Sequence, residues 1–226
     1  MNTVRTVADA KHDFYKAFSK PVNSIYRRVV DELLVEVHLL RVSQNFGYDS
    51  IFALGLATAF DRFMAGYQPE SDLEPIFKGL CQALLFDPDQ IRQESAHLIE
   101  LSKQFPAEVK SLFTTLEAGA DLDTLMGQIR AIATNPKFKY SRLFAVGVFI
   151  LLETADPEAI ADQDKRQALI TQVGDTLKIN SERLLKDLDL YRSNLEKIQQ
   201  GRQMMEDMVE AERKKREKKA KSVISS

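Results

Sequence analysis

The pattern in this sequence that most resembles a catalytic site is a glutamate followed three residues later by a histidine, Glu94 and His97. In carboxylate-bridged di-iron proteins, two such Glu-x-x-His pairs and two further carboxylates project into a four-helix bundle. Asp9 and His12 form an imperfect second pair. The remaining carboxylates would be Glu32 and Glu36. These residues define one alternative function, a ferritin-like di-iron metalloprotein.

The helical periodicity around Glu94 argues against that alternative. Ile91, Leu98 and Phe105 share one face of the expected helix, which is the face that should be buried. His97 falls on the opposite, polar face together with Gln93, Glu100 and Gln104. Because ligands on the polar face cannot converge inside a bundle, we expect His97 to be a surface histidine. We predict no metal site, no cofactor and no catalytic residues.

Nucleophilic catalysis and nucleotide binding have less support. Cys81, the single cysteine, lies in the segment GLCQALLF among core-type residues and has no histidine nearby in sequence. It is therefore expected to be a buried structural thiol, and a chain with one cysteine suits a reducing compartment. The glycines at 47, 55, 66 and 79 are isolated, so no glycine-rich phosphate loop is present.

Glu36 interrupts the apolar arc of the expected helix over Ser24–Leu40. That arc covers about half of the helix circumference, which predicts a central helix covered from at least two sides. A carboxylate in such a face needs a partner or water. Arg62, a charge in another largely apolar helix, is the natural counter-ion. We predict a structural ion pair between Glu36 and Arg62 rather than a catalytic acid.

Composition favours an all-α globular protein. The chain has 226 residues, 44% of them hydrophobic, with only 9 Gly and 7 Pro and no alternating β-branched run. The N-terminus lacks the apolar segment of a signal peptide, and it is too acidic for a typical transit peptide. The longest uncharged apolar run, Leu143–Leu152, is about half the length of a membrane span. We expect no transmembrane segment.

Helix start and stop signals divide the chain into about eight or nine helices, forming a globular bundle over residues 1–178. A capping box at Ser71–Glu74, the Asp87-Pro88 pair, Asp121 and Ser141 mark four of the helix starts. Two expected helices, Ile51–Ala65 and Arg142–Thr154, are almost wholly apolar and should be buried. Gly55 and Ala59 lie one turn apart on the first of these and permit another backbone to come close.

The C-terminal region has a different character. Residues 179–212 should form a long helix, because apolar residues from Leu177 to Val209 repeat at steps of four and three like a coiled-coil seam. The seam does not reveal whether a second copy, another protein or the chain's own body covers it. Residues 213–226 are expected to be a basic, disordered tail or a solvated helix end.

Seven cations lie in that basic tail, and a net charge of −2 for the whole chain hides their concentration. They are Arg213, Lys214, Lys215, Arg216, Lys218, Lys219 and Lys221. Contact with an anionic lipid surface or an acidic partner is the functional interpretation, and a solvated coiled-coil end is the structural one. Nucleic acid is not expected, because aromatic residues are absent from the tail and the rest of the chain is acidic.

Three long segments resemble the Thylakoid Formation One family of photosystem II biogenesis proteins. They are PVNSIYRRVVDELLVEVHLL at 21–40, YDSIFALGLATAFDRFMAGYQPE at 48–70 and IFKGLCQALLFDPDQIRQ at 76–93. The resemblance implies a non-enzymatic accessory factor in thylakoid and photosystem II biogenesis and repair. The expected lack of a transit peptide favours a cyanobacterial form over a chloroplast precursor. It implies a peripheral position on the cytoplasmic side of the thylakoid membrane and partnership with an FtsH-type membrane protease and with photosystem II assembly or repair components. No catalytic residues are carried over from the family.

Overall fold

The computed structural model describes residues 5–224, except the side chains of residues 205, 206, 209, 212 and 215–224. Every regular element in this described part is helical, which confirms the predicted all-α class. Eleven α-helices occur there: α1 (Val7–Ala17), α2 (Ser24–Arg41), α3 (Ser50–Phe63), α4 (Leu73–Ala83), α5 (Pro88–Gln104), α6 (Pro106–Thr115), α7 (Asp123–Thr134), α8 (Arg142–Ala155), α9 (Pro157–Ala161), α10 (Gln163–Leu177) and α11 (Ser181–Ile224).

Side-chain caps explain several helix starts. The Asp87 carboxylate accepts hydrogen bonds from the backbone N–H groups of Asp89 and Gln90, and the Ser141 hydroxyl accepts one from Phe144. Both caps were predicted. These bonds satisfy N–H groups that a helix leaves without an internal partner.

The predicted caps at Ser71 and Asp121 were wrong. Short 3₁₀ turns, Glu70–Asp72 and Ala120–Leu122, precede α4 and α7, and neither helix has a side-chain cap. Backbone bonds inside these turns, such as Asp72 N–H to the Pro69 carbonyl, take over the role of the cap. The Asp72 carboxylate instead pairs with Lys20 at 2.6 Å.

The centre of the body is the contact between α3 and α8, rather than α2 as the sequence suggested. Every residue of α8 from Leu143 to Leu152 is buried, and so are ten of the 14 residues of α3. The helix α2 lies to one side, against α1, α3 and α4, and Leu39 on its outer face is 58% exposed. The wide apolar arc of α2 correctly predicted that several helices pack against it. The uninterrupted apolar sequences of α3 and α8 were the better indication of which helices lie at the centre of the body.

Glycine permits α3 and α8 to touch backbone to backbone. A Cβ atom added to Gly55 would lie 1.8 Å from the Leu143 carbonyl oxygen, and one added to Gly147 would lie 2.0 Å from the Ile51 carbonyl oxygen. The predicted close approach at Gly55 is therefore confirmed, and its partner is α8.

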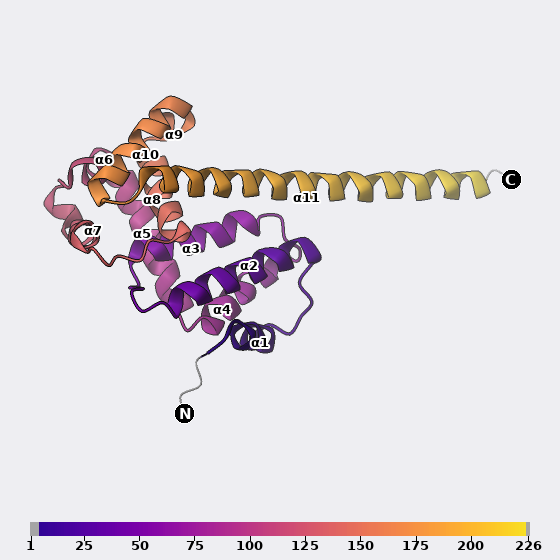
Figure 1. The fold of residues 1–226 in the computed structure, drawn as a ribbon. Coiled ribbons are helices and arrows are strands. Elements are labelled where there is room, and N and C mark those ends of the chain that lie inside the picture. The colour runs from indigo at the N-terminus through magenta and orange to yellow at the C-terminus, as the bar shows by residue number, and fades with distance from the viewer. Residues whose placement is uncertain (1–4, 225–226) are drawn as a thin grey trace.

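The helix α11 has a docked part and a projecting part (Figure 1). Leu184, Leu188 and Tyr191 are buried against the body, and Arg202 donates a hydrogen bond to the Ala65 carbonyl at 3.3 Å. Beyond Arg202 the helix extends away from the other helices (Figure 1). The chain's own body thus covers the first part of the predicted seam.

The helix also continues past the predicted boundary at residue 213. One helix runs through Ile224, which agrees with the helical alternative for 213–224 and not with the disordered tail, and residues 225–226 lie outside the described part. Alanine, glutamate, lysine and arginine dominate this segment and are strong helix formers. A Glu210–Lys214 ion pair at 2.7 Å, one turn apart, adds to that preference.

Replacing Gly55 or Gly147 by alanine should strongly destabilise the protein. The added methyl group would overlap a backbone carbonyl, so α3 and α8 must separate, at a cost of about 3 kcal/mol or more in unfolding free energy. Gly127→Ala is the matched control: this helical glycine has open space around its Cβ position, and the change should be neutral or stabilise by about 0.5–1 kcal/mol. Urea denaturation of the three variants measures the difference, and equal midpoints would contradict the proposed backbone contact.

Candidate functional site

A groove of about 790 Å³ lies between α2 and the docked part of α11. Buried residues of α2, α3, α8 and α11 form its floor, and exposed or half-buried residues of α2 and α11 form its rims. The floor includes Leu33, Ala59, Leu143, Val146 and Tyr191. The rims include Arg27, Arg28, Glu32, Glu36, Leu190 and Asn194.

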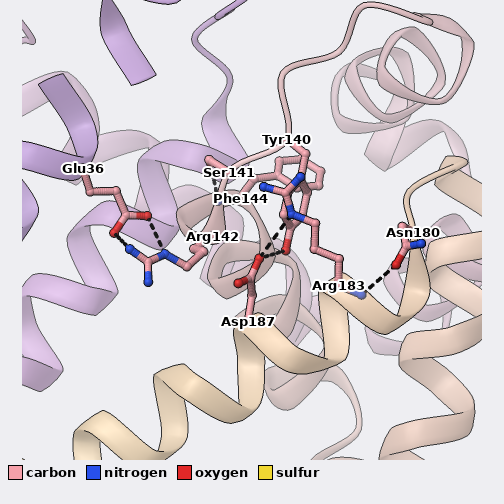
Figure 2. A network of polar contacts seen from close by, with 8 residues as sticks. All are labelled: Glu36, Tyr140, Ser141, Arg142, Phe144, Asn180, Arg183 and Asp187. Carbon is pink, nitrogen blue, oxygen red and sulfur yellow. Dashed lines mark hydrogen bonds and ion pairs between the residues drawn. The ribbon is translucent and has the colours of Figure 1, made fainter. Parts of the chain in front are cut away.

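A bidentate ion pair borders the groove. Arg142, the first residue of α8, donates from Nε and Nη2 to the two carboxylate oxygens of Glu36, at 3.0 and 2.6 Å (Figure 2). The Ser141 cap starts α8 immediately before this arginine and thereby positions it beside α2. The pair links α2 to α8 with the geometry that guanidinium and carboxylate groups favour.

The predicted Glu36–Arg62 pair is therefore wrong in its partner. Arg62 instead donates to Glu153 near the C-terminal end of α8. Glu36 is also less buried than a core charge, since 25% of its side chain is exposed, and that of Arg142 is 45% exposed. Glu36 on α2 and Arg62 on α3 are therefore both paired, but with two different residues of α8.

A second polar cluster adjoins the first and holds the start of α11. The Tyr140 hydroxyl donates to Asp187 at 2.8 Å, and the Arg183 guanidinium lies over the Tyr140 ring at 4.8 Å (Figure 2). The Asn180 side chain accepts from the Arg183 backbone N–H at 2.8 Å. Burial, reinforced by the bond to Asp187, raises the pKa of Tyr140, so this tyrosine remains a hydrogen-bond donor at neutral pH.

The groups proposed for di-iron chemistry do not come together. Tyr48 donates to one oxygen of Glu94 at 2.6 Å, and Gln90 donates to the other at 2.8 Å. His97 is exposed, as expected from its helix face. Among the described residues no three His, Cys, Asp or Glu side chains gather closely enough to hold a metal ion. The geometry does not favour the di-iron alternative.

Cys81 is fully buried, as predicted. Burial raises the pKa of its thiol to about 12, which opposes formation of the reactive thiolate. A structural role is the better interpretation of this cysteine.

The basic segment is described only in part. Arg213 and Lys214 are exposed on the projecting part of α11, and Lys214 pairs with Glu210. The side chains of Lys215, Arg216, Lys218, Lys219 and Lys221 lie outside the described part of the structure. Over the described residues, no helix combines the length and apolar character needed to cross a bilayer.

Sequence reasoning missed Arg142, Glu153 and Asp187. Arg142 did carry a signal, because it directly follows the Ser141 cap and is the one charge at the start of an otherwise apolar helix. Glu153 carried a similar signal as the first charge after the apolar run Leu143–Leu152. Asp187 lies among many charged residues of α11, and only its contact with Tyr140 distinguishes it.

Comparison with known proteins places this architecture in a family. A family model described as thylakoid formation protein matches residues 6–220. The chain belongs to the thylakoid formation protein family. The family resemblance inferred from residues 21–93 is thereby confirmed and extends over nearly the whole chain, including most of α11.

Similar proteins agree with that assignment. Protein Thf1 of Acaryochloris marina is 48% identical over 96% of this chain and 88% of its own length. Protein Thf1 of Nostoc punctiforme is 49% identical, over 97% of this chain and 94% of its own length. A solved structure of Psb29 matches with a TM-score of 0.80 and 40% identity, covering 94% of this chain and 99% of that one.

The Glu36–Arg142 pair can be tested by a double-mutant cycle. Glu36→Gln alone should lower the unfolding free energy by about 0.5–1 kcal/mol. The coupling energy between Glu36→Gln and Arg142→Gln should be of similar size. It should fall with added salt, because both side chains are partly exposed. The control cycle combines Glu36→Gln with Arg62→Gln, whose effects should simply add, since the two residues have different partners. Chemical denaturation measures both cycles. Coupling to Arg62 but not to Arg142 would contradict the observed pairing.

Proposed function

We propose that this protein is a non-enzymatic accessory factor in thylakoid and photosystem II biogenesis and repair, and that it supports an FtsH-type membrane protease. The observation that carries the proposal is membership of the thylakoid formation family over residues 6–220. The Thf1 and Psb29 relatives align with almost the entire chain. The proposed function therefore belongs to the whole protein and not to one part of it.

The proposed position is peripheral, on the cytoplasmic side of the thylakoid membrane. Charge separation within the chain supports it: residues 213–221 contain seven cations and one acid, whereas the rest of the chain is acidic. Each lysine or arginine near an anionic membrane surface contributes about 1 kcal/mol of attraction. Because α11 projects from the body, its cations can approach a membrane while the acidic body stays at a distance (Figure 1).

Affinity purification from solubilised thylakoid membranes tests the protease partnership. A tagged full-length chain should retain subunits of the FtsH-type protease together with photosystem II assembly or repair components. Recovery of lipids without any protease subunit would contradict the partnership and would favour a membrane-shaping role instead.

Vesicle flotation tests the membrane contact separately. The full chain should bind phosphatidylglycerol vesicles at low salt and dissociate at high salt, because exposed cations are screened within about 10 Å at 0.1 M salt. Deletion of residues 213–226 should abolish binding, and neutral phosphatidylcholine vesicles serve as the control surface. Equal binding by the full and truncated chains would reject a role for Arg213, Lys214 and the following cations.

A further inference from the structure

The groove between α2 and the docked part of α11 has a narrow apolar floor. The floor side chains come from four helices, and each is only 1–5% exposed: Leu33, Ala59, Leu143, Val146 and Tyr191. A trough wide enough to receive an α-helix, which is about 10 Å across with its side chains, would leave such a floor open to solvent. The groove therefore fits a thinner occupant, such as a single hydrocarbon chain.

The groove is also bounded at both ends. At one end α2 meets α11, because a Cβ atom added to Gly201 would lie 3.9 Å from the Ile25 side chain. At the other end Arg142, which binds Glu36 on α2, lies near Asp187 on α11 (Figure 2). These ends are about 16 Å apart, given a rise of about 1.5 Å per residue from Ile25 to Glu36. A ligand of limited length fits between them, whereas a longer helix of a partner protein would have to separate one of these contacts.

The charges along the rims are paired with one another. Three ion pairs border the groove: Arg28–Glu32 at 2.8 Å, Arg142–Glu36 at 2.6 Å and Lys11–Asp31 at 3.0 Å. Arg27 lies on the opposite side of α2 from Glu36, because the nine positions between them amount to about two and a half helical turns. The rims therefore suit a ligand head group without net charge. Its hydroxyl or carbonyl groups can bond to the guanidinium and carboxylate groups and to the Asn194 amide.

We propose that this groove binds a free single-chain amphiphile with an uncharged head group that forms hydrogen bonds. The hydrocarbon chain lies along the apolar floor, and the head group lies between the rims. Alkyl glycosides and monoacylglycerols belong to this chemical class. Binding sites between the helices of a bundle commonly combine an apolar lining with a few polar groups in this way. The ligand site does not depend on the protease partnership.

Calorimetric titration of the full chain tests the ligand class. The probes are dodecyl maltoside, dodecanoate and dodecyltrimethylammonium, which share one chain length and differ in head-group charge, each used below its critical micelle concentration. Dodecyl maltoside should bind at one molecule per chain. Both ions should bind about tenfold more weakly or worse, since the rim charges are already paired. No binding of the maltoside would overturn the proposal, and so would an ion that binds as tightly.

Blocking variants test the location of the ligand. Asn194→Phe places a ring at the half-buried α11 rim and should weaken maltoside binding about tenfold or more. Gln199→Phe is the matched control, because this exposed amide on the same helix does not line the groove, and its binding should equal that of the parent chain. Ala59→Met fills the floor itself and should also abolish binding. Circular dichroism identifies the folded variants, and Asn194→Phe decides the test if Ala59→Met does not fold. A folded Asn194→Phe variant that binds like the parent would overturn the proposal.

Two further measurements distinguish other occupants of the groove. Neutral phosphatidylcholine vesicles should not bind the chain, because the proposed ligand is a free molecule. Vesicle binding that Asn194→Phe abolishes and Gln199→Phe retains would show that the groove takes a chain from a bilayer lipid instead. A parent chain that binds none of the three probes, together with loss of protease subunits from Asn194→Phe in affinity purification, would assign the groove to a partner protein. Each of these results would overturn the free ligand, whereas affinity purification of the parent chain tests the protease partnership by itself.

Discussion

The structure depends on the contact between α3 and α8, where two helix backbones meet at Gly55 and Gly147. Each glycine leaves room for a carbonyl group of the other helix, so the two most apolar helices approach without intervening side chains. Close packing of this kind transmits small changes, because a protein interior has few voids to absorb them. The remaining helices are arranged around this pair, with α5 against both of its members and α11 contacting both from another side.

The ion pairs of α8 show how the same contact organises the polar surface. Its first residue, Arg142, reaches α2, and Glu153 near its end reaches α3. Because these pairs are partly exposed, each contributes little free energy, and their role is to align helices whose packing is already determined by apolar contacts. Tyr140 and Asp187 extend this arrangement to α11. The groove between α2 and α11 is thus bordered in part by the ion pair that ties α2 to the first residue of α8.

Much of the fold could be predicted from local sequence signals. Asp87 and Ser141 cap helices as expected, Gly55 does allow a close backbone approach, and the two apolar segments are buried. These features depend on neighbours within a few residues or on uninterrupted composition. The partner of Glu36 could not be predicted in the same way, because Arg142 lies 106 residues away and the choice between it and Arg62 depends on how α8 crosses α3. The sequence also could not predict where α11 packs, because the same apolar spacing occurs in a helix that docks on its own body and in one that pairs with another helix.

The position of Gly201 gives α11 a mechanical property. Glycine weakens a helix interior, and this one lies directly before Arg202, whose side chain rests against Gly66 at the edge of the body. The body holds the helix up to Arg202, so the segment that follows is a lever whose base lies beside a glycine. A swing of about 10° there displaces the tip by roughly 6 Å, given a rise of about 1.5 Å per residue. A small bend beside the body thus determines how far the cationic end of the chain can sweep.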